Sequence, residues 1–169
     1  MIETFAATAV ALYAAHHVGD YWVQTDEQAK HKGAAGPEGR GHCAKHVATY
    51  VLTQAVFLVP LELLGLGMSG LGILLALLVS GVTHYLADRR EYGIMFRLAR
   101  KLPGKARFLT LGVPRQGLTF YGQDSDHLTM VEVEATDNPT LGTGAWALDQ
   151  SWHIFWGVYV AALIIAALS

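Results

Sequence analysis

The charged residues of this chain are confined to a few stretches, and long uncharged runs separate them. These runs cover 4–19, 46–61, 63–87 and 150–169 and are 16, 16, 25 and 20 residues long. A helix needs about 20 apolar residues to cross the hydrocarbon core of a bilayer. Soluble domains have about 25% charged residues, whereas this chain has 15%. The pattern predicts an all-α membrane protein and argues against a buried soluble core, which is the competing interpretation.

Four transmembrane helices are expected in a single domain that spans 1–169. Their predicted bounds are about 4–23, 43–64, 68–88 and 146–168. The glycines at 65, 67 and 70 predict a tight turn between the second and third helices. The N-terminus has no Lys or Arg before Lys30, so it lacks the basic region of a cleaved secretory signal. We therefore expect a four-helix transmembrane bundle whose first helix is retained.

Two polar connections join these helices. The first, 24–42, is rich in small residues and predicts a flexible connector. The second is a large insert, 89–145, between the third and fourth helices. Its basic start, 89–102, has the spacing of an amphipathic helix, and its later part is compatible with a small β-hairpin at 118–121 and 128–135.

The basic residues predict the orientation of the chain. Of the twelve Lys and Arg, four lie at 30–45 and eight at 89–115. The positive-inside rule then places both connections in the cytoplasm and both termini outside. The bilayer and its anionic lipid head groups are the expected partners of the basic helix. No nucleic-acid partner is expected, because the membrane explains the basic stretch more simply, and the sequence is compatible with a homo-oligomer.

Histidine and aspartate recur four residues apart inside the predicted helices. The three pairs are His16 with Asp20, His84 with Asp88, and Asp149 with His153. On a helix this spacing places both side chains on one face. The order is reversed in the last helix, which runs the opposite way, so the His of every pair lies deeper in the membrane. His46, at the cytoplasmic start of the second helix, falls in the same layer.

Such a layer predicts a metal centre. Three carboxylates at one depth repel one another, and titratable groups near lipid are costly unless they pair or bind something. A divalent metal resolves the repulsion. Zinc is the first choice and iron or manganese the alternatives, while the single Cys43 excludes a Cys-based cluster. The competing interpretation for any one His is an interhelical hydrogen bond.

Roles follow for the residues of this layer. The expected ligands are His16, His46, His84 and His153, with Asp20, Asp88 and Asp149 divided between ligand, bridge and catalytic general base. Gln24 continues the face of the first pair and would orient a ligand or a bound phosphate. Arg89 and Arg90 follow Asp88 and would hold an anionic head group. His42 lies four residues before His46 and is a weaker candidate.

These motifs resemble a family of small bacterial and phage integral membrane proteins described only as a domain of unknown function. The resemblance rests on HxxGD(F/Y)xxQ at 16–24, His46, HxxxD at 84–88 and DQxxH at 149–153. It covers the four helices but not the insert at 103–145. It implies a multi-spanning protein with polar motifs and no more. The predicted location is the bacterial inner membrane, which the chain would cross several times. The layout is also similar to that of membrane-bound metal-dependent hydrolases, a likeness at the level of fold.

The leading hypothesis is a metal-dependent hydrolase with its centre at the cytoplasmic boundary of the membrane. Its substrate would be an ester or phosphoester associated with the membrane. The alternative is a non-catalytic membrane component, either a metal or proton conduit or a structural assembly subunit. A haem-binding bundle is disfavoured, because three carboxylates would surround the iron.

Overall fold

A computed structural model describes residues 1–109, 111, 119–120, 130–131 and 143–169 of the protein. Within these residues the chain is mostly helical, which confirms the predicted helical class. The elements in chain order are α1 (Ile2–Val18), η1 (Gly19–Val23, π-helical), α2 (Asp26–His31), α3 (Gly36–Leu63), α4 (Gly70–Asp88), η2 (Arg90–Tyr92, 3₁₀), α5 (Ile94–Lys101), α6 (Lys105–Leu109), β1 (Thr119–Phe120), β2 (Met130–Val131), α7 (Thr143–His153), η3 (Ile154–Val160, π-helical) and α8 (Ala161–Leu168).

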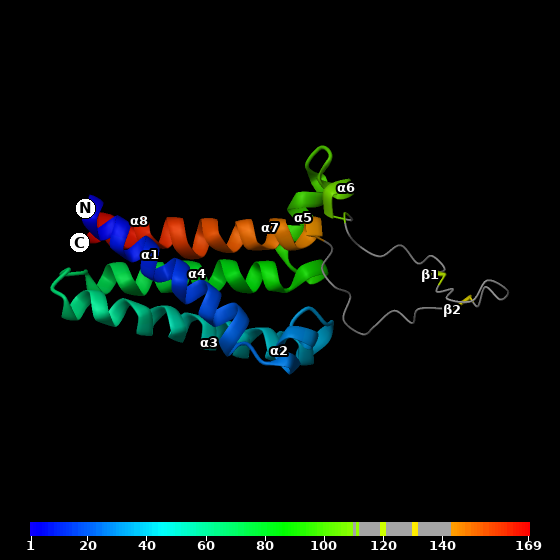
Figure 1. Ribbon diagram of the computed structural model, residues 1–169, viewed down its shortest axis with the longest axis horizontal. Coiled ribbons are helices and arrows are strands. Elements are labelled where there is room, and N and C mark those ends of the chain that lie inside the picture. Colours follow the sequence, from blue (N-terminus) through cyan, green and yellow to red (C-terminus); the bar gives the residue numbers. More distant parts are fainter. Residues whose placement is uncertain (110, 112–118, 121–129, 132–142) are drawn as a thin grey trace.

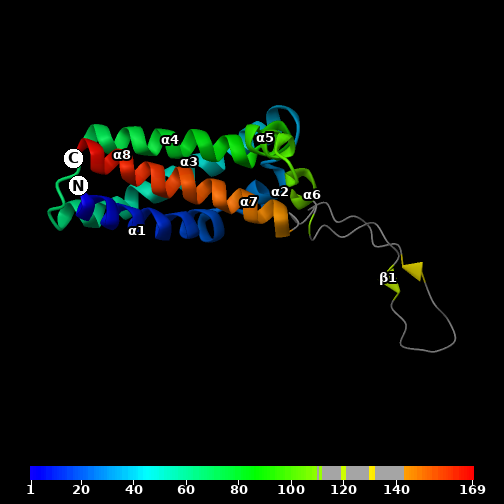
Figure 2. The ribbon, with the colours of Figure 1, turned by 90° about the horizontal axis from the view of Figure 1, so that it is seen from above.

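The long helices lie side by side along the long axis of the molecule (Figures 1 and 2). α1 contacts α3 and α8, and α4 contacts the same two helices. α7, η3 and α8 follow one another as a single long rod (Figure 1). Both termini and the turn between α3 and α4 lie at one end, which we call the terminal end. α2, α5 and α6 lie at the opposite end (Figure 1).

Three helical stretches are long and apolar enough to cross a membrane by length and composition. They are Gly36–Leu63, Gly70–Asp88 and Gly144–Leu168. Their outward faces are apolar, since Leu52 and Val56 on α3 and Leu74 and Leu78 on α4 are all more than half exposed. Charged side chains cover such faces in soluble proteins. α1 is not among the three stretches; it is 17 residues long, and the π-helical segment η1 continues it.

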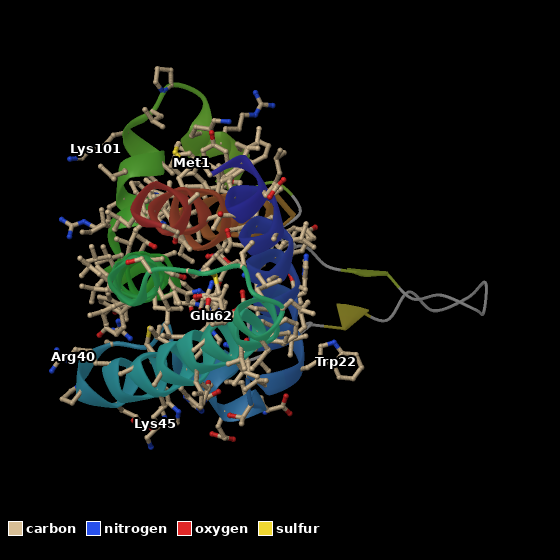
Figure 3. All side chains as sticks on the ribbon, turned by 90° about the vertical axis from the view of Figure 1, so that its left-hand side faces the viewer. Met1, Trp22, Arg40, Lys45, Glu62 and Lys101 are labelled. Atoms are coloured by element: carbon tan, nitrogen blue, oxygen red, sulfur yellow. The ribbon has the colours of Figure 1, made fainter. Side chains whose placement is uncertain are left out.

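Two apolar clusters lie at different levels of the helices. The first joins α1, α3, α4, η3 and α8 and includes Leu12, Leu58, Ala76 and Ile165. The second joins α4, α5, α6 and α7 and includes Met95, Phe96 and Leu109. Figure 3 looks along the helices from the terminal end and shows labelled charged side chains such as Arg40, Lys45 and Lys101 at the periphery.

The first connection differs from the prediction. Residues 24–42 were expected to be a flexible connector, but they form α2 and the first turns of α3. Thr25 and Gln28 make a reciprocal capping box at the start of α2. Pro37 stands in the first turn of α3, where a missing N–H costs nothing. α3 therefore begins at Gly36, earlier than the predicted residue 43.

The insert is described in part. The basic stretch expected as one helix over 89–102 consists of η2 and α5, with Met95, Phe96 and Ala99 buried. Gly93 lies between η2 and α5. The position requires glycine, because a Cβ there would lie 2.1 Å from the carbonyl oxygen of Leu86. β1 and β2 pair antiparallel, Thr119 with Val131 and Phe120 with Met130. The remainder of the expected hairpin lies outside the described residues.

Candidate metal centre

Two imidazole nitrogens lie beside one carboxylate oxygen from each of two aspartates in a buried layer. The Nε2 atoms of His46 and His84 lie 3.0 Å apart. Asp20 Oδ1 lies 3.3 Å from the first nitrogen and 3.4 Å from the second. Asp88 Oδ2 lies 3.2 Å from each of the same nitrogens. None of the four residues is more than 9% exposed, and together they are called the His/Asp cluster below.

Several polar atoms of this region lack a hydrogen-bond partner among the described residues. They are Asp20 Oδ1, Asp88 Oδ2, His84 Nδ1 and His153 Nε2. Buried polar atoms normally have a partner, and a buried carboxylate without one is costly. Carboxylate oxygens and imidazole nitrogens are the ligands that divalent metals take in proteins. Two overlapping sets could hold a metal ion: Asp20, His46 and His84, and His84, Asp88 and His153.

The cluster is assembled where regular α-helix gives way to π-helix. Asp20 lies in η1, directly after α1, and η3 begins directly after His153. π-helical turns are rare and occur frequently at functional sites. Gly19 allows η1 to approach α3 closely, because a Cβ there would lie 2.8 Å from Cδ2 of Tyr50. The backbone is therefore π-helical at two of the three helices that carry a His–Asp pair, those of His16 with Asp20 and of Asp149 with His153.

Lys32 brings a buried cation to the cluster. Its Nζ lies 2.8 Å from Asp88 Oδ1. With its amide oriented to satisfy both neighbours, Gln24 accepts from Lys32 Nζ at 2.9 Å and donates to the carbonyl of Asp20 at 3.2 Å. Burial alone would lower the pKa of Lys32, but Asp88, then Asp20 and Asp149, outweigh burial and raise it. The carboxylates around Lys32 thus favour its charged form.

Arg89 fixes the segment that carries Lys32. Its Nη1 donates to the carbonyl of Lys32 and its Nη2 to that of Ala34, both at 2.7 Å. Arg89 is 5% exposed. The expectation that Arg89 holds an anionic head group stays a prediction; in this structure its Nη1 and Nη2 donate to backbone carbonyls. The side chain of Arg90 lies against Gly33.

His153 has one ring nitrogen hydrogen-bonded to the backbone and the other near the cluster. Its Nδ1 donates to the backbone carbonyl of Asp149 at 2.7 Å. A carbonyl oxygen can only accept, so the proton of the neutral imidazole lies on Nδ1 and Nε2 keeps its lone pair. This Nε2 lies 3.9 Å from Asp88 Oδ1. The carboxylate of Asp149 lies beside the same ring, with Oδ2 3.6 Å from Nδ1.

A chain of buried hydrogen bonds leads from the cluster into the bundle. His16 contacts Gln150 Oε1 through Nε2 at 3.0 Å and the hydroxyl of Tyr50 through Nδ1 at 3.2 Å. Gln54 Nε2 donates to the same hydroxyl at 3.2 Å, and Ser80 Oγ donates to Gln54 Oε1 at 2.7 Å. The ring of Tyr50 also packs on His84, with centroids 3.9 Å apart.

The structure brings five of the seven expected ligands into these two sets. His16 and Asp149 lie at the edge: His16 Nδ1 is 3.5 Å from Asp20 Oδ2, and Asp149 contacts His153. His42 lies against the ring of His31, outside the cluster. Sequence reasoning missed Lys32 and Tyr50. For Tyr50 a signal exists, because Tyr50 and Gln54 follow His46 at intervals of four residues on α3.

Comparisons with known proteins identify no relative of this chain. No family model, no curated protein and no solved structure matches the chain. The functional interpretation rests on the residues and distances given above.

Proposed function

We propose that this protein is a membrane metal-binding protein whose His/Asp cluster holds one divalent metal ion. The observation that carries the proposal is the convergence of two imidazole nitrogens with two unpartnered carboxylate oxygens in a buried layer. A cation satisfies both oxygens at once and compensates the carboxylates that burial would otherwise penalise.

Zinc is the proposed metal. Ligand atoms at about 2.0–2.1 Å from a tetrahedral zinc ion lie about 3.3 Å from one another. The triangle formed by Asp20, His46 and His84 has edges of 3.0, 3.3 and 3.4 Å. The triangle that Asp88 forms on the same His–His edge has edges of 3.0, 3.2 and 3.2 Å. Iron and manganese accept the same ligand types and are the alternatives.

The membrane placement belongs to this proposal. Three helices meet the length and apolarity of a membrane span, and we propose that α1 with η1 is a fourth, completing a transmembrane bundle. The basic helix α5 and the start of α3, with Arg40 and Lys45, share one end of the molecule with Lys30 and Lys32 (Figure 1). By the positive-inside rule this end is cytoplasmic and the termini are outside, in a bacterial inner membrane. The three His and Asp motifs likewise support kinship with the family of small integral membrane proteins.

Anionic lipid head groups are the proposed contact of α5. The buried face of this helix packs on the bundle, while Ile94, Leu98 and Leu102 remain 43%, 49% and 57% exposed beside Arg97 and Lys101. Apolar and basic side chains on one exposed helix are typical of a segment at an anionic membrane surface.

The activity we propose is hydrolysis of an ester or phosphoester associated with the membrane. A divalent ion supplies Lewis-acid chemistry, since it acidifies water and polarises a carbonyl or phosphoryl oxygen. The lone pair on His153 Nε2 suits this residue to accept a proton from water, and the Asp149 carbonyl holds the ring in the required tautomer. Lys32 and Gln24 hold Asp88 and Asp20 in place.

One observation favours a non-catalytic alternative. Asp20 and Asp88 each have an oxygen close to both His46 and His84. If both carboxylates bound one zinc ion with these two histidines, four protein ligands would fill its shell, as in structural zinc sites, whereas catalytic sites keep one position open. Among non-catalytic functions, a structural component is favoured over a conduit. The hydrogen-bonded chain ends at Gln54 and Ser80, and Leu12, Leu58 and Ile165 form an apolar layer beyond them.

Metal analysis of the detergent-purified protein tests the proposed centre. We expect the wild type to retain about one zinc ion per chain after desalting and His84→Ala to lose it, because His84 belongs to both candidate sets. His17→Ala is the matched control, since His17 neighbours His16 but faces Tyr13 and Tyr21. Wild type without bound metal, or equal metal content in wild type and His84→Ala, would contradict the centre.

His153→Gln separates hydrolysis from a structural function. In the hydrolase, this variant keeps its metal and its unfolding temperature but loses at least about 100-fold in turnover of a generic aryl phosphate or ester, the range of general base catalysis. A wild type that holds metal, unfolds on chelation and hydrolyses neither substrate supports the structural alternative.

A further inference from the structure

The two oxygens of the Asp88 carboxylate have different neighbours. Oδ2 faces the His46 and His84 nitrogens, both at 3.2 Å. Oδ1 is paired with Lys32 Nζ at 2.8 Å and is also the oxygen that lies 3.9 Å from His153 Nε2. The Asp88 carboxylate thus faces the two imidazole nitrogens with one oxygen and the ammonium group of Lys32 with the other.

Lys32 contacts one residue of a second possible metal site. His84, Asp88 and His153 form the second set of residues that could hold a metal ion. His84 Nδ1 and His153 Nε2 have no hydrogen-bond partner among the described residues. A carboxylate that bridges two metal ions, as in two-metal centres, would present Oδ1 to the second ion. In the structure that oxygen is already paired with the ammonium group of Lys32.

The charges of the buried layer also favour a single divalent ion. The layer contains three buried carboxylates, Asp20, Asp88 and Asp149. Lys32 carries one compensating positive charge and a divalent ion two more, so a second divalent ion would add positive charge that is costly to bury. Arg89 is a further buried cation nearby, and its donors go to the carbonyls of Lys32 and Ala34.

The chain holds Lys32 in place with several independent contacts. Arg89 binds the carbonyls on either side of Gly33, and the side chain of Arg90 packs so closely that a Cβ at Gly33 would lie 2.8 Å from it. A Cβ at Gly39 would lie 2.1 Å from the carbonyl oxygen of Ala34. Gln24 accepts a hydrogen bond from the ammonium itself. These contacts fix where the cation stands.

We propose that Lys32 is a built-in cation that occupies the second cation position of the centre and limits the protein to one divalent metal ion. The inference rests on the proposed metal centre and specifies its stoichiometry. Lys32 thus places an ammonium group on the carboxylate oxygen that a second metal ion would bind in a two-metal site.

Metal stoichiometry tests the proposal on the full-length protein in detergent. Each variant is saturated with Zn²⁺, desalted and analysed for metal per chain. We expect about one ion in the wild type, about two in Lys32→Met, which keeps the apolar stem and removes the charge, and about one in Lys32→Arg. Lys30→Met is the control and should resemble the wild type, because Lys30 is exposed on α2.

Electron paramagnetic resonance of Mn²⁺-loaded samples gives a second measurement. Two ions that share the Asp88 carboxylate give an exchange-coupled spectrum, expected in Lys32→Met, whereas the wild type should give the spectrum of an isolated ion. A coupled pair or two ions per chain in the wild type would overturn the proposal, and this outcome needs no variant to fold.

The remaining outcomes separate this proposal from the metal centre itself. One ion in both wild type and a folded Lys32→Met overturns the role of Lys32 and leaves the centre intact. No metal in the wild type overturns both. If Lys32→Met unfolds during purification, added Zn²⁺ should rescue its folding by replacing the lost charge, and a lack of rescue counts against the proposal.

Discussion

At the scale of single residues, Tyr50 connects the His/Asp cluster to the interior of the bundle. Its ring packs on His84 while its hydroxyl contacts His16 and Gln54. The side chain is fully buried. Losing the hydroxyl would leave two buried polar groups without this partner, and each such loss is costly.

We expect Tyr50→Phe to lower the free energy of unfolding by about 1–3 kcal/mol and to retain metal, because the phenyl ring can still pack on His84. The reaction of Cys43 with a thiol-reactive dye during heating measures unfolding, since this single cysteine is fully buried. Tyr13→Phe is the control, because Tyr13 is 47% exposed. Equal unfolding temperatures in the two variants would contradict the role given to Tyr50.

The spacing of His and Asp in the sequence identified the residues that meet but not the atoms that pair. Asp20 contacts His46 and His84, which belong to other helices, more closely than it contacts His16 on its own helix. Spacing along one helix carries no information about such contacts. Lys32 was missed because its place in the layer depends on α2 and on Arg89, and a basic residue in a polar connection is normally solvated.

At the scale of elements, close packing between helices depends on glycine. Gly157 lies in η3, and a Cβ there would lie 2.9 Å from the Tyr50 hydroxyl and 3.0 Å from Ser80 Oγ. Small residues allow helices in membranes to approach closely. Here the approach also aligns the carbonyl of Gly157 with Gln54 Nε2, which donates to it at 2.9 Å.

Gly157→Ala should therefore destabilise the protein by about 1–3 kcal/mol, the cost of overpacking a well-filled interior. Gly41→Ala is the matched control: it lies within α3 with nothing within 4 Å of the added Cβ, so the higher helix propensity of alanine should stabilise by up to about 1 kcal/mol. Both are measured by thermal unfolding in the same detergent. Equal effects of the two substitutions would count against tight packing at η3.

Arg89→Gln tests the attachment of the segment between α2 and α3. The variant loses charge-assisted hydrogen bonds to two carbonyls, each worth about 1.5–3 kcal/mol. We expect trypsin to cleave after Lys30 and Lys32 at least several-fold faster than in the wild type. Arg97→Gln, on the exposed face of α5, should leave these cleavage rates unchanged; unaltered cleavage in Arg89→Gln would contradict the clamp.

The helices of high apolarity were predicted closely from sequence. The third was expected at 68–88 and is Gly70–Asp88, and the fourth was expected at 146–168 and ends at Leu168. The polar connection at 24–42 was predicted poorly, because its glycines were given more weight than the capping box at Thr25 and Gln28. The two π-helical segments leave no recognised mark in hydrophobic periodicity.

At the scale of the whole molecule, polarity is divided along the long axis. The His/Asp cluster and the basic elements lie toward the end with α2 and α5, while the apolar cluster around Leu58 and Ile165 fills the half nearer the termini. In the proposed orientation the centre exchanges ions with the cytoplasm and is sealed from the other side.

Fusions at the C-terminus test this orientation. We expect alkaline phosphatase fused after Ser169 to be active and green fluorescent protein at the same position to be dark, because both termini are proposed to lie outside. Fusion of the same reporters within the exposed turn at Gly104 should give the reverse pattern. Fluorescence from the C-terminal fusion would reverse the proposed topology.

The π-helical segment η3 determines the direction in which His153 points. A π turn holds one residue more than an α turn, so η3 amounts to a single-residue insertion within a long helix. Deleting one residue from Ile154–Val160 would restore α-helix and rotate His153 by about 100° relative to α8. The helix would survive and the four residues of the His/Asp cluster would stay in place, but His153 would turn away from Asp88. Under the proposed function, a deletion of one codon would therefore leave a chain that binds metal and lacks its base, so the length of this helix matters to the site as much as its histidines do.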